Sequence, residues 1–168
     1  MKPYKLMKWL RVLISGKPHF VIGSPGSPYL LRWYVIPRNR WMNVYLHKIV
    51  RDDDDRALHD HPWWFASLVL RGGYRELIRH GNSLTGMIDP HQTIERRPGS
   101  VAIRTTNEAH RVELFRDAGG KPIPSWTLVF TGRKVREWGF WCSGKGFVVW
   151  TDFVSQSDHG NIGKGCGD

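Results

Sequence analysis

The spacing of apolar and polar residues predicts one short helix at the start of the chain. Residues 4–14 carry apolar side chains at helical intervals with Lys5, Lys8 and Arg11 between them, which is typical of an amphipathic helix. The next stretch, residues 15–28, is rich in Gly, Pro and Ser and predicts a loop with a short strand at 19–22. We therefore assign residues 1–28 to an N-terminal helix and loop.

Shorter apolar runs dominate the rest of the chain, and most of them end at Gly, Pro, Asn or Asp. Runs of this length predict strands, and no long helical pattern lies among them. The pattern favours an all-β fold, a sandwich or jelly-roll barrel over residues 29–154, followed by a flexible glycine-rich tail at 155–168. The predicted strands lie at residues 29–36, 42–50, 64–70, 74–79, 101–104, 111–115, 126–131 and 147–150.

The composition fits one compact β domain, and the placement of its charge is unusual. A chain of 168 residues with 40% hydrophobic residues and nine Trp is long enough to bury a core. The net charge of +10 lies entirely in residues 1–51, which hold ten Lys or Arg and no Asp or Glu. This asymmetry indicates either an arm that faces nucleic acid or a membrane surface, or a basic rim beside the acidic run at 52–55.

Two cysteines are too few for a disulfide framework, so we expect a cytoplasmic protein. Cys142 is then either a small buried core residue or a thiol that points into a substrate pocket. The N-terminal helix is too short and too charged to span a bilayer, and we expect no transmembrane segment.

His59 and His61 stand two apart, just ahead of an apolar run that ends at Gly72. Because successive side chains of a strand point to opposite faces, both imidazoles would share one face and Asp60 would point to the other. Imidazole is a common ligand of zinc, copper, nickel and iron, so this spacing suits a metal site that takes further ligands from elsewhere. Two surface or capping histidines are the alternative interpretation.

A second segment adds a third histidine. Gly99 and His110 stand eleven positions apart, and with the His-x-His pair they make the chain resemble the cupins, β-barrel proteins whose two motifs hold one metal ion. The resemblance covers about residues 42–154. It departs from the cupin pattern at the Glu positions of the first motif, which hold Phe65 and Ala66, and at three positions of the second motif, which hold Thr105, Asn107 and Leu114.

The resemblance implies a cupin-type jelly-roll barrel with His59, His61 and His110 as ligands of a divalent metal ion. We expect Fe(II), with Zn, Ni or Mn as alternatives. Asp55 is the candidate carboxylate in place of the absent Glu. The pattern around the His-x-His pair looks like a group of uncharacterised single-domain cupins of bacteria and their phages, for which no reaction is settled.

Four further residues are candidates for the substrate pocket, and a fifth, His47, is a candidate ligand or partner of the metal centre. His47 shares a strand face with Tyr45, so an inward His47 could orient a ligand or bind substrate, whereas an exterior position is the alternative. Arg104 and Arg111 flank the second motif and could hold an anionic substrate bidentately, unless they simply face solvent. The substrate-pocket candidates are Tyr45, Arg104, Arg111 and Cys142.

Three functions are consistent with these residues. The first is a mononuclear non-haem Fe(II) enzyme that uses dioxygen on a small molecule, since cupins with three histidines and no Glu resemble the thiol dioxygenases. The second is a non-catalytic cupin that binds a metal or small ligand. The third is a phage or prophage protein whose basic N-terminal third docks on nucleic acid or protein. A homodimer is a further expectation.

Overall fold

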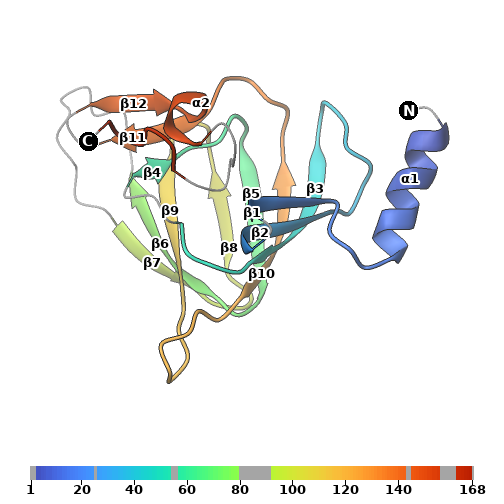
Figure 1. Ribbon diagram of the computed structural model, residues 1–168, viewed down its shortest axis with the longest axis horizontal. Coiled ribbons are helices and arrows are strands. Elements are labelled where there is room, and N and C mark those ends of the chain that lie inside the picture. The colour runs from blue at the N-terminus through green and yellow to red at the C-terminus, as the bar shows by residue number, and fades with distance from the viewer. Residues whose placement is uncertain are drawn as a thin grey trace.

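The computed structural model describes residues 3–24, 26–53, 57–79, 92–142, 145–155 and 162–167, which form a barrel of two antiparallel six-stranded sheets (Figure 1). The first sheet contains, in spatial order, β1 (Phe20–Ser24), β2 (Ser27–Tyr34), β3 (Asn43–Ile49), β10 (Ser125–Thr131), β5 (Phe65–Arg71) and β8 (Val101–Arg104). The second contains β12 (Gly146–Val149), β11 (Gly139–Cys142), β4 (Leu58–His59), β9 (Ala109–Leu114), β6 (Tyr74–Arg79) and β7 (Gln92–Arg96). The all-β jelly-roll prediction is confirmed.

Strand register decides which side chains face the space between the sheets. Residues directly opposite each other on neighbouring strands share a face. Along the first sheet, His47 on β3 lies opposite Arg32 on β2 and Thr127 on β10, and Tyr45 lies opposite Val129. A core cluster joins the two sheets and contains Leu30, Ile49 and Val69 of the first with Tyr74, Val112 and Leu114 of the second. Burial of these apolar side chains holds the sheets face to face.

Each of the eight predicted apolar runs coincides with a strand, but the sequence pattern missed four elements. The polar strand β7 has no buried residue, so it lacks the alternation that marks a half-buried strand. Strand β4 contains only two residues and β11 only four, so neither gives a long alternating pattern. The last element is α2 (Trp150–Phe153), a four-residue helix whose Phe153 is buried.

The free thiol expected at Cys142 is wrong, because Cys142 and Cys166 form a disulfide with their Cα atoms 5.6 Å apart. Residues 162–167, the described part of the predicted flexible tail, also make backbone hydrogen bonds to the rest of the chain. Ile162 pairs with Val154, and the backbone N–H of Gly163 donates to the carbonyl of Phe153 at 2.9 Å. These contacts place the C-terminal segment against the core cluster that contains Phe140, Phe153 and Cys142. Cys166 packs against this cluster, beside Cys142.

The N-terminal helix α1 (Pro3–Ile14) stands at the end of the barrel opposite the C-terminus (Figure 1). Its Trp9 donates an indole hydrogen bond to the carbonyl of Tyr34 at 2.8 Å, and the ring of His19 lies 3.2 Å from the carbonyl of Trp9. Leu6, Met7, Leu10 and Ile14 remain exposed. Within the described parts of the chain, no helix has the length and apolar character needed to cross a bilayer.

Candidate metal centre

His59, His61 and His110 converge inside the barrel. His59 on β4 is the cross-strand partner of His110 on β9, and His61 follows directly after β4. One nitrogen from each ring lies within 4.8 Å of the others, and the Nε2 atoms of His61 and His110 are 2.9 Å apart. Two nitrogens bound at right angles to one ion, each at about 2.0–2.1 Å, would be separated by roughly 3 Å. The His61–His110 pair therefore has the spacing of two ligands of one ion, and together with His59 the three rings could hold a metal ion.

Asp60 points away from the two histidines that flank it, as strand alternation predicts. It is fully buried and accepts hydrogen bonds from the backbone N–H of Gly139 at 3.0 Å and the indole of Trp141 at 3.1 Å. Arg136 pairs with the same carboxylate at 2.9 Å. A buried charge is tolerated when it is paired and hydrogen-bonded in this way. Asp60 thus holds β4 against β11 and positions the histidines on the other face.

Glu76 orients His110. The carboxylate is 1% exposed, and its Oε1 lies 2.8 Å from Nδ1 of His110. Arg104 and Arg96 donate to the other oxygen at 2.9 and 2.7 Å. Burial alone would raise the pKa of Glu76, but the hydrogen bond and charge of His110 and the charge of Arg104 outweigh it and lower the pKa to about 2.

An ionised Glu76 accepts the Nδ1 proton of His110, which leaves the lone pair of Nε2 free for a metal ion. Glu76 is not among the candidates predicted from the sequence. A signal was present, because Glu76 lies between Tyr74 and Ile78 on the buried face of β6. A carboxylate on the apolar face of a strand needs a partner inside the barrel, and His110 lies opposite Ile78 on the neighbouring strand.

A second carboxylate approaches the centre from the acidic run. Oδ2 of Asp53 lies 3.7 Å from Nδ1 of His59 and also accepts the backbone N–H of Val112 at 2.7 Å. Tyr29 donates its hydroxyl to the other oxygen of Asp53. The candidate residue Asp55 lies outside the described residues. In the described part of the run, the carboxylate beside the histidines is that of Asp53.

The electrostatic environment favours neutral imidazoles. Burial lowers the pKa of His61 well below its ordinary value, and the neighbouring His110 and His59 lower it further. Burial also lowers the pKa of His110, although Glu76 acts in the opposite direction. Neutral imidazole is the form that binds metal ions. At neutral pH His61 and His110 are therefore in the form that binds metal.

Phe65 fills the place where the cupin pattern has Glu. Its ring is buried and lies edge-on to His61 at 4.8 Å between centroids, and 5.6 Å from the ring of His110. Ala66 faces the other way, because its cross-strand partners Ile103 and Phe130 are exposed on the outer face of the sheet. Of the two candidate positions, only residue 65 faces the histidines, and it carries no ligand atom.

His47 and Tyr45 face the interior, as the inward interpretation of His47 predicts, and the exterior alternative is wrong. Both are buried, and their rings stack with centroids 5.7 Å apart. Arg32 donates from Nε to Nε2 of His47 at 2.8 Å. Burial and the Arg32 charge lower the pKa of His47 well below its ordinary value. His47 is not one of the three converging histidines.

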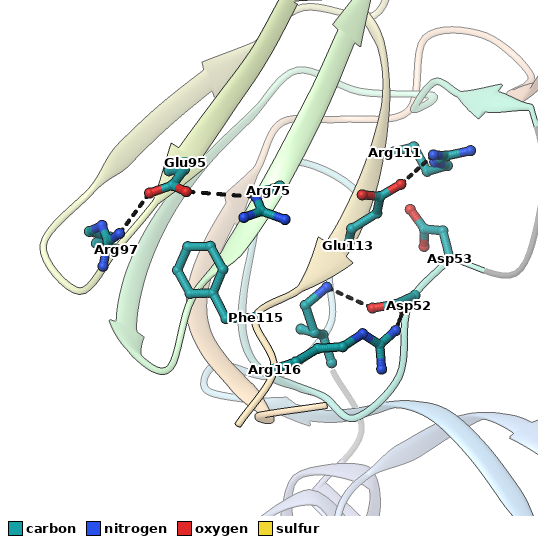
Figure 2. A pocket seen from close by; sticks show the side chains of 10 residues that line it. Asp52, Asp53, Arg75, Glu95, Arg97, Arg111, Glu113, Phe115 and Arg116 are labelled. Carbon is teal, nitrogen blue, oxygen red and sulfur yellow. Dashed lines mark hydrogen bonds and ion pairs between the residues drawn. The ribbon is translucent and has the colours of Figure 1, made fainter. Parts of the chain in front are cut away.

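The two arginine candidates lie on opposite faces of the sheets. Arg104 is buried and paired with Glu76, so the expectation that it faces solvent is wrong. Arg111 points outward, pairs with Glu113, and belongs to a pocket of about 800 Å³ on the outer face of β6, β7 and β9 (Figure 2). Its four arginines and four acidic residues balance in charge. The pocket is lined by Asp52, Asp53, Arg75, Glu95, Arg97, Arg111, Glu113, Leu114, Phe115 and Arg116.

Solved structures show what this fold resembles. Iron(II) HppE in complex with substrate is 11% identical over 70% of this chain and 57% of its own, with a TM-score of 0.50. A provisionally assigned mannose-6-phosphate isomerase from Ralstonia eutropha is 15% identical over 68% of this chain and 92% of its own, with a TM-score of 0.48. A cupin superfamily protein from Desulfitobacterium hafniense is 14% identical over 62% and 78%, with a TM-score of 0.41.

The two-sheet barrel and the likeness to HppE show that the chain has the cupin fold predicted from its sequence. No model of a known protein family matches the sequence. No curated protein is similar to it in sequence. At such low identity the likeness concerns architecture, and the chemistry has to be argued from the residues themselves.

Proposed function

We propose that this protein is a mononuclear metal-binding cupin and an Fe(II)-dependent enzyme that uses dioxygen on a small molecule. The observation that carries the proposal is the convergence of His59, His61 and His110, with their nitrogen atoms within 4.8 Å of one another. This cluster is held by residues distributed over both sheets, so its geometry does not depend on one mobile loop.

The donor set fits a divalent transition metal. Three neutral imidazoles suit Fe, Zn, Ni or Mn, and Glu76 accepts a hydrogen bond from the nitrogen of His110 that faces away from the cluster. The buried Phe65 adds no fourth ligand. A three-histidine site keeps coordination positions open for substrate and dioxygen, which is the property that an oxygen-using enzyme needs.

When bound, the ion would supply Lewis acidity and, as iron, the capacity to react with dioxygen. The protein's part is to hold His61 and His110 in their neutral form and to exclude water with Phe65 and the aromatic rings around it. Trp138 and Phe140 extend this apolar wall, since their rings lie 6.4 and 6.0 Å from that of His59.

Elemental analysis of protein purified without a histidine tag tests the metal proposal. We expect about one equivalent of a divalent metal in the wild type and none in His61→Ala. Oxygen uptake by Fe(II)-loaded protein with thiols, small phenols and sugars then tests the reaction class. Metal bound at full occupancy with no uptake above that of His61→Ala would favour a non-catalytic binding protein, which is the second candidate function.

We also propose that the protein is a homodimer through the outer face of the first sheet. Cross-strand register places an uncharged row, Val101, Leu68, Leu128, Leu46 and Trp33, across five strands. Ile103 beside this row is 67% exposed and Val101 58%. A second copy is the favoured occupant, because an uncharged row can meet its own copy by two-fold symmetry without repulsion.

Sedimentation equilibrium tests the dimer. Ile103→Lys places a charge beside the row and should give monomers, whereas Val135→Lys, at a position 61% exposed outside the row, should leave the mass unchanged. A monomeric wild type would contradict the proposal.

A further inference from the structure

Arg32 is a cation inside the barrel that has no carboxylate partner among the described residues. Its Nε donates to His47, and its guanidinium carbon lies 4.7 Å from the centre of the Tyr45 ring. Neither group carries negative charge, and a guanidinium stays protonated in proteins. Other arginines at buried polar clusters do have such partners: Arg96 and Arg104 pair with Glu76, and Arg136 pairs with Asp60.

The hydrogen bond to His47 leaves the far end of the guanidinium available. Nε is engaged at 2.8 Å, whereas Nη1 and Nη2 of Arg32 make no hydrogen bond to the described residues. These two nitrogens carry parallel N–H groups whose spacing matches the two oxygens of a carboxylate. The stacked pair of Tyr45 and His47 holds the guanidinium in place, so little side-chain entropy would be lost on binding.

Arg32 also lies near the histidine cluster. Tyr45, which lies under the guanidinium, packs against Phe65 in one buried cluster, and Phe65 contacts the rings of His61 and His110. A molecule held by Arg32 would therefore have its other end close to the three histidines.

The local charge balance favours a monoanion. Burial keeps His47 neutral, and Glu76 is already matched by Arg96 and Arg104. Arg32 therefore adds a positive charge with no carboxylate beside it among the described residues, and the charge of Arg38 also acts on Arg32. A partly buried charge without a counter-charge is costly, and a bound carboxylate would offset that cost.

We propose that Arg32 binds the carboxylate of a small organic acid through Nη1 and Nη2, and that this acid is the substrate. The assignment as substrate rests on the proposed function, because the metal ion would face the other end of the acid. The binding of the carboxylate by Arg32 does not depend on the metal.

Isothermal titration calorimetry of metal-free protein tests this with propionate, its uncharged analogue propionamide, and methylphosphonate. We expect saturable binding of propionate and none of propionamide. Arg32→Gln should weaken propionate binding by about tenfold or more, the size expected for the loss of a charged hydrogen-bond pair. Arg40→Gln is the matched control, because Arg40 is an exposed arginine 4.6 Å from the centre of the Trp41 ring, and it should bind as the wild type does.

Arg32→Lys keeps the charge but loses the two parallel N–H groups of the guanidinium, so it should bind propionate with intermediate affinity. It is the variant to measure if Arg32→Gln does not fold. Equal binding by wild type and Arg32→Gln, equal binding of propionamide, or no binding of propionate would overturn the proposal. Methylphosphonate that binds more tightly than propionate would overturn the choice of carboxylate. Metal content, measured on the same samples after reloading, should be unchanged by Arg32→Gln. Wild type that fails to take up metal yet binds propionate contradicts the proposed function only.

Discussion

The histidine cluster and the outer pocket both contain ion pairs between arginine and glutamate, and these pairs differ in burial. In the outer pocket, Arg75 and Glu95 form an ion pair with side chains that are 59% and 43% exposed. In the cluster, Arg104 and Glu76 form one with side chains that are 8% and 2% exposed. Water weakens the first pair, whereas burial strengthens the second and fixes the proton on His110. The cluster differs from the outer pocket because burial sets the protonation states of Glu76 and His110.

The largest expected effect comes from Glu76→Gln, which removes the buried charge. Arg96 and Arg104 would lose their counter-charge, and we expect a loss of stability of about 3–5 kcal/mol, measured by urea unfolding. Metal affinity should fall by about 10–100-fold, because His110 is no longer held in its ligand tautomer. Glu95→Gln in the outer pocket is the control and should cost less than about 1 kcal/mol. Similar effects of both substitutions would remove the distinction between the two regions.

The second effect is a loss of folding stability on acidification. The pKa values of His61 and His110 are lowered in the folded state, so the unfolded chain takes up their protons first. Stability of the metal-free protein is therefore full above about pH 6.5 and falls as the pH drops below it. Glu76, with its pKa lowered to about 2, adds a second loss between pH 4.5 and 2, worth roughly 3 kcal/mol. Urea unfolding at a series of pH values measures both, and stability that stays constant from pH 7 to 5 would contradict the first.

A smaller and more specific effect is expected at the position of the absent Glu. Phe65→Glu places a carboxylate beside His61 and His110, so it should destabilise the metal-free protein and bind a divalent ion more tightly. Ala66→Glu adds the same charge on the outer face and should change neither metal affinity nor the metal-dependent rise in melting temperature. Differential scanning calorimetry with and without Zn²⁺ separates the two. An equal response of both variants would show that residue 65 does not face the metal.

Removal of residues 1–15 should have the smallest effect on the site. Helix α1 contacts the barrel through Trp9 and lies outside both sheets, so metal content measured by elemental analysis should stay within error of the wild type. The same truncation should weaken binding to acidic partners, because it removes four of the ten basic residues in the first 51. Loss of metal from a truncated protein that retains its β-sheet circular dichroism would contradict this prediction.

The pattern of short apolar runs predicted the β fold, and the resemblance to the cupin motifs predicted the three histidines. Both are local properties of the sequence: His59 and His61 flank Asp60, which points to the opposite face, and His110 follows Gly99 by eleven positions. The partners that make the site work are not local. Glu76 meets His110 from a strand 34 positions away, and Asp60 meets Arg136 from 76 positions away. Such contacts depend on the order of strands in the sheets, which periodicity does not specify.

The same limit explains the errors at Cys142 and Arg104. A single pair of cysteines 24 positions apart carries no signal of pairing until the C-terminal segment is placed over β11. Arg104 alternates inward with Ala102, but an arginine at the end of a short strand is usually solvent-exposed, so the buried acid that it meets had to be known first. Sequence patterns locate ligands better than they locate the groups that orient them.

The Cys142–Cys166 bond makes the stability of this chain depend on the redox state of its surroundings. The covalent ring encloses β12 and α2, and closing a ring of that length in the unfolded chain corresponds to about 3–4 kcal/mol of conformational entropy. Where glutathione keeps thiols reduced, the protein would lose that contribution and its last residues would be held by hydrogen bonds and packing alone. The same sequence would thus be a more persistent protein in an oxidising compartment than in the cytoplasm.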